Sequence, residues 1–473
     1  YYVVVGLVNP TTPIVGFGRS EEWNTETPNP LDNFNYSNHV GDTMTFGKKV
    51  TTDNVRRLIT RRNWSQGTKY EMYRHDYSLK NPSPITGSSR LYDSSYYVMN
   101  QNFDVYVCID NGSTGILTTG NASQDEPVFT DLEPSRAGES GDGYIWKYLF
   151  TVPPNDIIKF DSTEYISVPS NWPTATTTQI QSVRENGDST INNNQIRKVY
   201  IEKQGFGYTQ NQSGVECDII GDGTGAKVVI DTDSEGKITK TNVSSGGSGY
   251  TYGMVDLGPV QKNTTVQVRA KLVPIIPPSR GHGYDLYKEL GTDKLLVYAR
   301  FDDSTKDFPI DTKFAQIGII KNPNQAGSST TVFTEAKFSS LSGIKFSSVA
   351  GTLPVAGDII RQEVSNLNTA KGYVASYDSE TKVLKYIQDR SLYFDPTNSA
   401  VIDQTDYDDV DSRGKVLAFE SSPNAVTSDG FSAAIETTFS AGIATVGTKN
   451  VDLGVTFTNG LASPEINKGS GTI

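Results

Sequence analysis

The sequence has few of the residues that build catalytic, metal or disulfide centres. Among its 473 residues only three are histidine (His39, His75 and His282) and two are cysteine (Cys108 and Cys217). Two isolated cysteines do not make a disulfide framework, and Cys108 falls in a strand-like run. We therefore expect both to be reduced thiols within strands, which suits assembly in a reducing cytoplasm.

Long apolar runs and an excess of positive charge are also missing. No run of about 18 or more apolar residues occurs, so we expect no membrane partner. The formal net charge is −12. This value disfavours nucleic acid as a partner, because a groove that follows phosphates needs clustered Lys and Arg. No signal peptide is visible, but the sequence starts at Tyr1 and not at Met, which leaves targeting open.

Two segments approach binding loops without completing them. Residues 231–236 match the first half of a calcium loop, but Asn242 stands where a bidentate Glu is required. Residues 41–49 approach a phosphate loop with one residue too many, and Lys49 replaces the Ser or Thr that would hold magnesium. We predict a polar hairpin turn for the first segment and a chance match for the second.

The sequence also lacks the common catalytic patterns. The patterns H-E-x-x-H, C-x-x-C and G-x-S-x-G do not occur. His282 lies between two glycines and is interpreted as a turn residue. Asp142 and Glu164 flank an aromatic strand, like the acid and base of a glycosidase, but Asp142 is explained more simply as the turn residue of a Gly-Asp-Gly sequence. The sequence therefore predicts no cofactor, no metal and no enzyme.

What the chain does contain favours β structure. Gly (43 residues) and Tyr (25 residues) are plentiful, charged residues make up 20% and hydrophobic residues 36%. This mixture favours strands and turns in a folded protein, and the length indicates two to four domains. We predict a mainly β, multi-domain fold with a minor α+β component: an antiparallel β-sandwich-like core, inserted β modules and a few short helices.

The most informative segment is an aromatic strand. Tyr144, Trp146, Tyr148 and Phe150 alternate with other residues and so lie on one face of a strand. Each ring could bury about 150–250 Å², or roughly 4–6 kcal/mol at ~25 cal/mol per Å² as an upper estimate. Two prolines, Pro153 and Pro154, should end the strand. Such a strand organises a core or an interface.

Two further segments carry structural signals near the start of the chain and in its middle. Residues 52–59 combine cap-type residues with apolar spacing, which predicts a short helix. Nearby, a basic cluster lies beside Trp64 and consists of Arg56, Arg57, Arg61 and Arg62. It is either a solvated surface with one buried arginine or a contact to an acidic neighbouring subunit. A G-x-G-Y-T unit at residues 205–209 recurs at residues 247–251 and predicts a repeated β unit.

The rest of the chain continues these patterns. A short helix is expected at residues 285–290, with Gly291 as its cap, and strands are expected at residues 295–301 and 314–320. Residues 326–462 carry strand-like pieces separated by turns, which predicts a sandwich or a small barrel.

Four segments, in order along the chain, resemble one known family. They are residues 17–23 (F-G-R-S-E-E-W, with Arg19 and Trp23), residues 59–70 (with Arg61, Arg62 and Trp64), residues 138–169 around the aromatic strand, and residues 314–323. Together they resemble the baseplate wedge protein of T-even-type contractile-tailed phages, the gene product eight family. The resemblance covers roughly residues 1–170 and 284–325, with two β blocks inserted.

The resemblance implies a domain plan. Residues 1–184 and 264–325 would form the two parts of a core wedge domain. Residues 185–263 would be an inserted β module that contains the repeat, and residues 326–462 an inserted β domain. Residues 463–473 would begin a return to the core, cut short at the end of this sequence.

The resemblance also implies a function. It implies a non-catalytic structural subunit in the virion tail baseplate, assembled in the host cytoplasm, dimeric, and in contact with wedge subunits of the gene product six, seven and ten type. The subunit would move as a rigid body during baseplate rearrangement. Its structural or interface residues would be Arg19, Trp23, Arg61, Arg62, Trp64, Tyr144, Trp146, Tyr148 and Phe150.

A second function stays open. Aromatic side chains on an exposed face stack on sugars, so the chain could instead be a receptor-binding or carbohydrate-binding tail module. The two hypotheses differ in where the rings of residues 144–150 lie. Burial favours the structural subunit, and an open groove favours the binding module.

Overall fold

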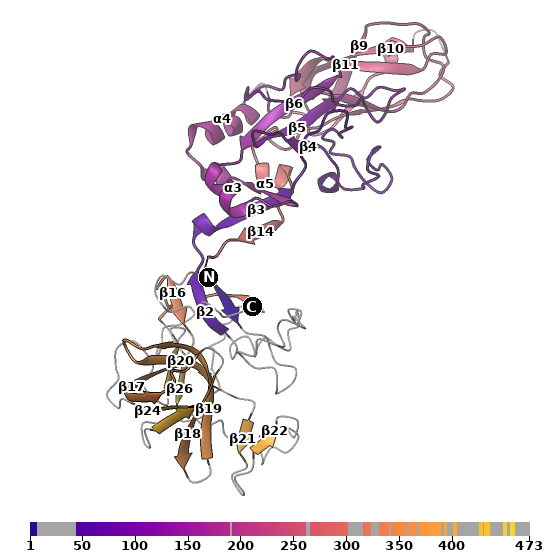
Figure 1. Ribbon diagram of the computed structural model, residues 1–473. Helices are drawn as coiled ribbons and strands as arrows, with labels where there is room; N and C mark the ends of the chain where they lie inside the picture. Colours follow the sequence, from indigo (N-terminus) through magenta and orange to yellow (C-terminus); the bar gives the residue numbers. More distant parts are fainter. Residues whose placement is uncertain are drawn as a thin grey trace. The chain divides into compact units, whose positions relative to one another are not determined.

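The protein forms two compact units (Figure 1). One unit is Thr52–Tyr298, and the other combines Tyr1–Thr51 with Ala299–Ile473. The computed structural model describes residues 1–6, 44–189, 192–261, 265–300, 316–322, 331–339, 342–355, 358–365, 368–388, 392–394, 401–403, 425–428, 430–435, 448–451 and 455–458. In these residues the strands of each sheet pair antiparallel, which confirms the mainly β, multi-domain prediction.

A three-stranded sheet organises the core of the Thr52–Tyr298 unit. Its order is β4 (Tyr97–Met99), β5 (Asp104–Asn111) and β6 (Tyr144–Thr151). The turn that leads into β6 has positive φ angles at Gly141 and Gly143, and between them Asp142 accepts a hydrogen bond from the Tyr144 amide (2.9 Å). The strand ends at Thr151, before the two prolines, as predicted.

A second sheet has the order β14 (Lys294–Val297), β3 (Val55–Thr60) and β7 (Tyr165–Val168). The prediction of a helix at residues 52–59 was therefore wrong. Only a 3₁₀ turn, η2 (Thr52–Asn54), precedes the strand. Leu58 and Ile59 are both buried although they point to opposite faces, because this central strand is covered on both sides. Neighbouring apolar residues on a doubly covered strand imitate the spacing of a helix.

Short helices connect these strands. The α-helices are α3 (Pro154–Phe160), α4 (Thr178–Gly187) and α5 (Leu286–Glu289). The 3₁₀ turns are η3 (Leu91–Asp93), η4 (Trp172–Thr174) and η5 (Gly258–Val260). Helix α5 confirms the prediction for residues 285–290, since Asp285 caps its start and Gly291 follows with φ of 63°.

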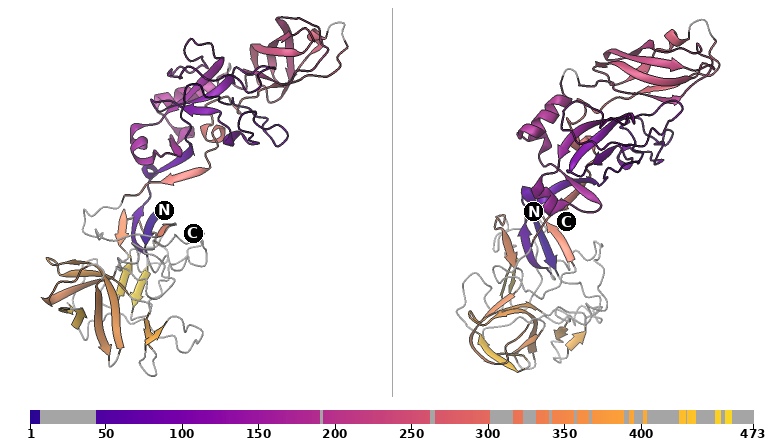
Figure 2. Two further views of the ribbon diagram at one scale, coloured as in Figure 1. Left: turned by 45° about the vertical axis from the view of Figure 1, so that its right-hand side comes forward. Right: turned by 45° about the horizontal axis from the view of Figure 1, so that its top comes forward.

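The remainder of this unit is a β module with a core of its own. Four strands pair in the order β11 (Ile238–Ser248), β10 (Thr224–Thr232), β9 (Val215–Gly221) and β12 (Gly253–Val255), and β8 (Val199–Lys203) pairs with β13 (Lys271–Pro274) (Figure 2). The strands of the module thus extend beyond residue 263, where the sequence placed its end. Whether the module is an insertion stays a prediction.

The G-x-G-Y-T repeat has the same structure in both copies. Tyr208 and Tyr250 are both buried in the module's core. The hydroxyl of Tyr208 accepts a hydrogen bond from the Ala270 amide (2.9 Å), and that of Tyr250 accepts one from the Ala226 amide (3.1 Å). In each copy the first glycine has a positive φ and leaves room for the tyrosine ring of its own unit. The repeat is therefore a tyrosine-anchored turn, used twice.

The second unit contains a sheet and a closed barrel. The sheet has the order β15 (Gln316–Ile320), β1 (Tyr2–Gly6), β2 (Met44–Lys49) and β16 (Lys337–Ser339). The barrel, whose curved strands Figure 2 shows, runs β17 (Ser342–Gly351), β20 (Val383–Gln388), β19 (Asn368–Asp378), β18 (Ile359–Ser365), β23 (Ala425–Ser428) and β24 (Phe431–Ile435). A small barrel was one of the two predictions for this block.

Two hairpins complete the described strands: β21 (Leu392–Phe394) with β22 (Val401–Asp403), and β25 (Thr448–Val451) with β26 (Val455–Thr458). The segments with Arg19 and Trp23, the near phosphate loop up to residue 43, and residues 463–473 lie outside the described residues. The predicted domain boundaries stay a prediction. The chain passes between the two compact units twice, between residues 51 and 52 and between residues 298 and 299, each time inside a predicted part of the core domain.

The repeat yields a test of the module. Replacement of Gly247 by Ala would place a Cβ 2.4 Å from the Thr224 carbonyl oxygen at a φ of +58°. We expect Gly247→Ala to destabilise the module by about 2–4 kcal/mol, through left-handed strain plus overpacking. Gly214→Ala is the matched control, since its φ is +70° and nothing lies within 4 Å; it should cost only about 1 kcal/mol. Urea denaturation measures the free energy of unfolding of both variants. Equal losses of stability would contradict this structure of the turn.

Candidate functional site: the aromatic strand and its surroundings

The four rings of strand β6 are buried. Tyr144, Trp146, Tyr148 and Phe150 have exposed fractions of 1%, 0%, 1% and 2%. All four belong to the main hydrophobic core of the Thr52–Tyr298 unit. The rings therefore form part of the interior of this unit and do not line an open groove, which is the outcome that favours a structural subunit over a carbohydrate-binding module.

The rings contact further aromatic side chains along the strand. Trp146 stacks on Tyr144, with ring centroids 5.3 Å apart and an interplanar angle of 12°, and meets the edge of Tyr70 at 5.8 Å. Phe150 meets Trp172 edge-on at 6.4 Å. Offset stacks and edge contacts of this kind add to the free energy gained by burial. The row thus joins β6 to the loop before β4 and to the 3₁₀ turn η4.

Most polar atoms on these rings have partners. The hydroxyl of Tyr144 donates to the Asn121 carbonyl oxygen (2.8 Å) and accepts from the Tyr70 amide (2.8 Å). Burial raises the pKa of Tyr144 and of Tyr148, so both stay neutral phenols. The indole nitrogen of Trp146 is buried without a hydrogen-bond partner, so the ring is held by packing and by its position in the strand.

The opposite face of β6 is also buried, and it carries a lysine and Phe150. The prediction that all four rings share one face was wrong for Phe150, because the pairing with β5 shifts by one residue at Leu149, so that Tyr148 lies opposite Tyr106 and Phe150 opposite Val105. Lys147 is 3% exposed, and Leu149 beside it is fully buried. The Lys147 ammonium group donates to the Leu132 carbonyl oxygen and to Asn186 Oδ1 of helix α4, each at 2.6 Å. Burial lowers the pKa of Lys147 to about 8. The burial of Lys147 was not predicted from the sequence, although its place within an aromatic strand could have indicated it.

The predicted arginine cluster is bonded within its own unit. Arg61 pairs with Asp161, and Arg62 donates to the carbonyl oxygen of Ser94 and lies over the ring of Tyr97 at 4.9 Å. Trp64 is half-buried, and its indole nitrogen donates to the Ser123 hydroxyl (3.0 Å). These contacts hold the three side chains within their own unit, and their structural role stays a prediction. A contact with a neighbouring subunit stays a prediction.

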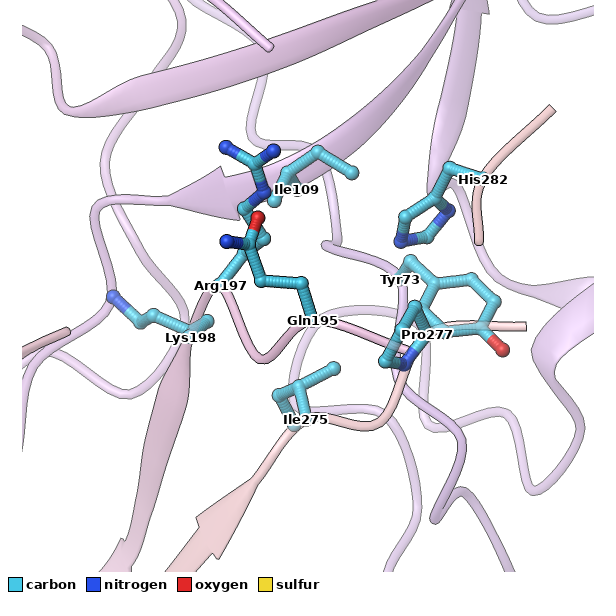
Figure 3. A pocket seen from close by; sticks show the side chains of 8 residues that line it. All are labelled: Tyr73, Ile109, Gln195, Arg197, Lys198, Ile275, Pro277 and His282. Atoms are coloured by element: carbon cyan, nitrogen blue, oxygen red, sulfur yellow. The ribbon is translucent and has the colours of Figure 1, made fainter. Parts of the chain in front are cut away.

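A small pocket lies beside the core, between the start of the module and the loop of His282 (Figure 3). Eight residues line it: Tyr73, Ile109, Gln195, Arg197, Lys198, Ile275, Pro277 and His282. It has room for about one water molecule. Two of its cations already have partners, since Arg197 pairs with Glu133 (3.0 Å) and Lys198 with Asp110 (2.7 Å). This pocket is too small for a sugar or a cofactor.

His282 occupies the predicted turn, but its ring is not on the surface. The neighbouring glycines have φ of 82° and 88°. The ring lies 2.6 Å from the buried carboxylate of Glu289 and meets Tyr73 edge-on at 4.8 Å. Residues 233–237 form the turn between β10 and β11, so the polar hairpin turn predicted at 231–236 is confirmed except that residues 231 and 232 still belong to β10. Asp233 accepts a hydrogen bond from the Lys237 amide (2.8 Å).

Three further observations concern sites that the sequence analysis considered. Cys108 and Cys217 are free and buried, as expected. Within the described ranges, no group of three or more His, Cys, Asp or Glu side chains is placed to hold a metal ion. No helix in the same ranges combines the length and the apolar character that a membrane crossing requires.

Comparison with known proteins identifies the aromatic strand as part of a family segment. Residues 118–205 match the family model described as "Bacteriophage T4, Gp8". The chain is also similar to "Baseplate wedge protein gp8" of Enterobacteria phage T4, with 27% identity over 186 residues, which covers 34% of this chain and 53% of that protein. The chain thus spans about half the length of this relative. The resemblance to the wedge protein family that the motifs predicted is confirmed.

The burial of Trp146 can be tested by truncation. We expect Trp146→Ala to destabilise the Thr52–Tyr298 unit by about 3–5 kcal/mol, because it removes a fully buried ring and its stacking contact with Tyr144. Tyr252→Ala is the matched control, since that ring is 63% exposed, and should change stability by no more than about 0.5 kcal/mol. Thermal unfolding measures both variants. A Trp146→Ala protein that melts like the wild type would show that the ring is not part of the core.

Proposed function

We propose that this chain is a non-catalytic structural subunit of the wedge in a contractile-tail phage baseplate, assembled in the host cytoplasm and located in the virion tail. The proposal is supported by the similarity of residues 118–205 to the T4 wedge protein family. It is also supported by the mainly β architecture, in which neighbouring strands are held by backbone hydrogen bonds.

One observation carries the proposal. The aromatic strand, Tyr144–Thr151, lies inside the segment that matches the family, and its rings are buried in the core. The feature that the chain shares with a wedge protein is therefore a structural spine and not a ligand site. A carbohydrate-binding module would instead need these rings at an accessible surface.

Movement as a rigid body requires that the β module be fixed to the core of its unit. Three kinds of contact fix it. The buried guanidinium of Arg74 pairs with Asp76 (2.7 Å) and lies over the ring of Tyr200, at the start of the module, at 3.9 Å. The ammonium of Lys198 pairs with Asp110 of strand β5. The Gly115 amide donates to the Thr239 carbonyl oxygen of strand β11 (2.9 Å).

The family resemblance extends the proposal to partners and domains. We propose a homodimer in contact with wedge subunits of the gene product six, seven and ten type. We also propose that residues 185–263 and 326–462 are insertions into a core built from residues 1–184 and 264–325. Nucleic acid and membrane are not proposed as partners.

Co-assembly tests the proposed function. The full chain is purified and mixed with the other wedge proteins of the phage that encodes it, and complexes are followed by size-exclusion chromatography with light scattering. We expect a dimer, with twice the mass of one chain, that enters a larger wedge complex. A protein that never joins such a complex, or that turns over a substrate, would contradict the proposal.

The fixed module gives a separate prediction. Arg74→Ala removes a cation that is 1% exposed and leaves Asp76 without its ion-pair partner. We therefore expect faster hydrogen exchange in strands β8 and β13. The barrel should exchange as in the wild type. Arg90→Ala, at an exposed position, is the control and should change neither. Mass spectrometry of deuterated peptides reads the result. Unchanged exchange in β8 and β13 would show that Arg74 does not hold the module.

A further inference from the structure

The environment of Lys147 differs from that of an ordinary buried lysine. Its ammonium nitrogen lies 2.6 Å from the side-chain oxygen of Asn186, in the last turn of helix α4, and 2.6 Å from the Leu132 carbonyl oxygen. Neither acceptor carries a charge. The other buried lysine of the described core, Lys198, has a carboxylate as its partner, Asp110 at 2.7 Å. Lys147 is thus a desolvated amine held against a carboxamide.

A carboxylate lies on the far side of the same carboxamide. The side-chain nitrogen of Asn186 donates to Glu133 Oε1 at 2.8 Å. Glu133 also accepts from Asn192 (2.8 Å) and from Arg197 (3.0 Å), and these hydrogen bonds hold it in place and help to lower its pKa against the effect of burial. The carboxamide of Asn186 is therefore placed between a nucleophile and a proton acceptor.

We propose that the side chains of Lys147 and Asn186 join in an isopeptide bond, formed by the folded chain itself with Glu133 as the proton shuttle. The neutral amine of Lys147 attacks Cγ of Asn186, which adjoins the oxygen that it contacts in the structure. The Nζ–Cγ bond forms and the Cγ–Nδ2 bond breaks. Glu133 accepts one proton from the attacking nitrogen and passes it to Nδ2, which leaves as ammonia.

Two requirements of this reaction have a physical basis in the structure. The nucleophile must be an uncharged amine, and burial favours that form because it lowers the pKa of Lys147 to about 8. The leaving nitrogen must gain a proton, and Glu133 already touches it. The reaction requires no oxidant, metal or cofactor. The reaction occurs once for each chain.

The bond would tie strand β6 to helix α4, across a separation of 39 residues along the chain. A cross-link of this kind restricts the unfolded chain, as a disulfide does. The two cysteines are free, so no disulfide supplies such a constraint. This inference does not depend on the proposed function, since it concerns only the chemistry of three side chains.

The mass of the full chain, purified in its folded state, tests the proposal. We expect an intact mass lower than the sequence mass by one ammonia molecule. We also expect a branched peptide after trypsin digestion, with the segment around Lys147 joined to the segment around Asn186. Asn186 is followed by Gly187, and an Asn-Gly pair can lose ammonia by forming a succinimide. Hydroxylamine cleaves the chain at a succinimide and leaves the isopeptide bond intact.

Variants separate the roles of the three residues. Glu133→Gln changes a side chain that is 55% exposed, so the protein should fold. We expect this variant to have the full mass of its own sequence, with no loss of ammonia, and to yield no branched peptide. Lys147→Arg should also keep its full mass. Lys198→Arg is the matched control, since it replaces the other buried lysine, and should lose ammonia like the wild type.

The outcomes are distinct. A wild-type protein with the full sequence mass, or one that hydroxylamine cleaves at Asn186, overturns the proposal. A branched peptide that persists in Glu133→Gln overturns the role of Glu133. Failure of co-assembly with wedge proteins would leave the mass result unchanged, so the two proposals fail separately.

Discussion

The burial of strand β6 on both faces is the constraint on which the larger unit depends. One face carries the rings of Tyr144, Trp146 and Tyr148, and Trp146 packs against Tyr70. The other face carries Lys147, which contacts helix α4, and Phe150, which packs against Trp172. A strand buried on both sides cannot slip freely by one residue, because a slip would move the rings of Trp146 and Tyr148 into the space of Lys147. Its register therefore fixes the position of everything that packs against it.

The sequence predicted the features that depend on local pattern. Alternating aromatics predicted the shared face of Tyr144, Trp146 and Tyr148 in β6. Paired glycines and tyrosines predicted the repeated turn, and short apolar runs predicted strands of the barrel. These predictions succeeded because period-two alternation and left-handed glycines are properties of a few neighbouring residues.

The predictions that failed concern residues whose structure depends on contacts with distant parts of the chain. Residues 55–60 resemble a helix in isolation and become a strand because β7 and β14 pair with both of their edges. The burial of Lys147 depends on helix α4, and the enclosed position of the His282 ring depends on Tyr73, in each case a contact between segments distant in the sequence. Tertiary contacts of this kind leave no periodic signal.

Two observations support a structural function: the rings of strand β6 are buried, and residues 118–205 are similar to a phage wedge protein family. Rings that are enclosed cannot receive a sugar, and the pocket beside them holds about one water molecule. The segment that contains them is the one that is similar to a phage wedge protein. Stiffness, supplied by the aromatic spine and by the fixed β module, is the property that a subunit moving as a rigid body requires.

The most direct measurement is a density map of the tail baseplate of the phage that encodes this chain. The account predicts that the chain is found within each wedge, with strand β6 enclosed in the interior of the subunit. A baseplate that lacks the chain, or a map in which the rings of β6 face a bound glycan, would contradict it.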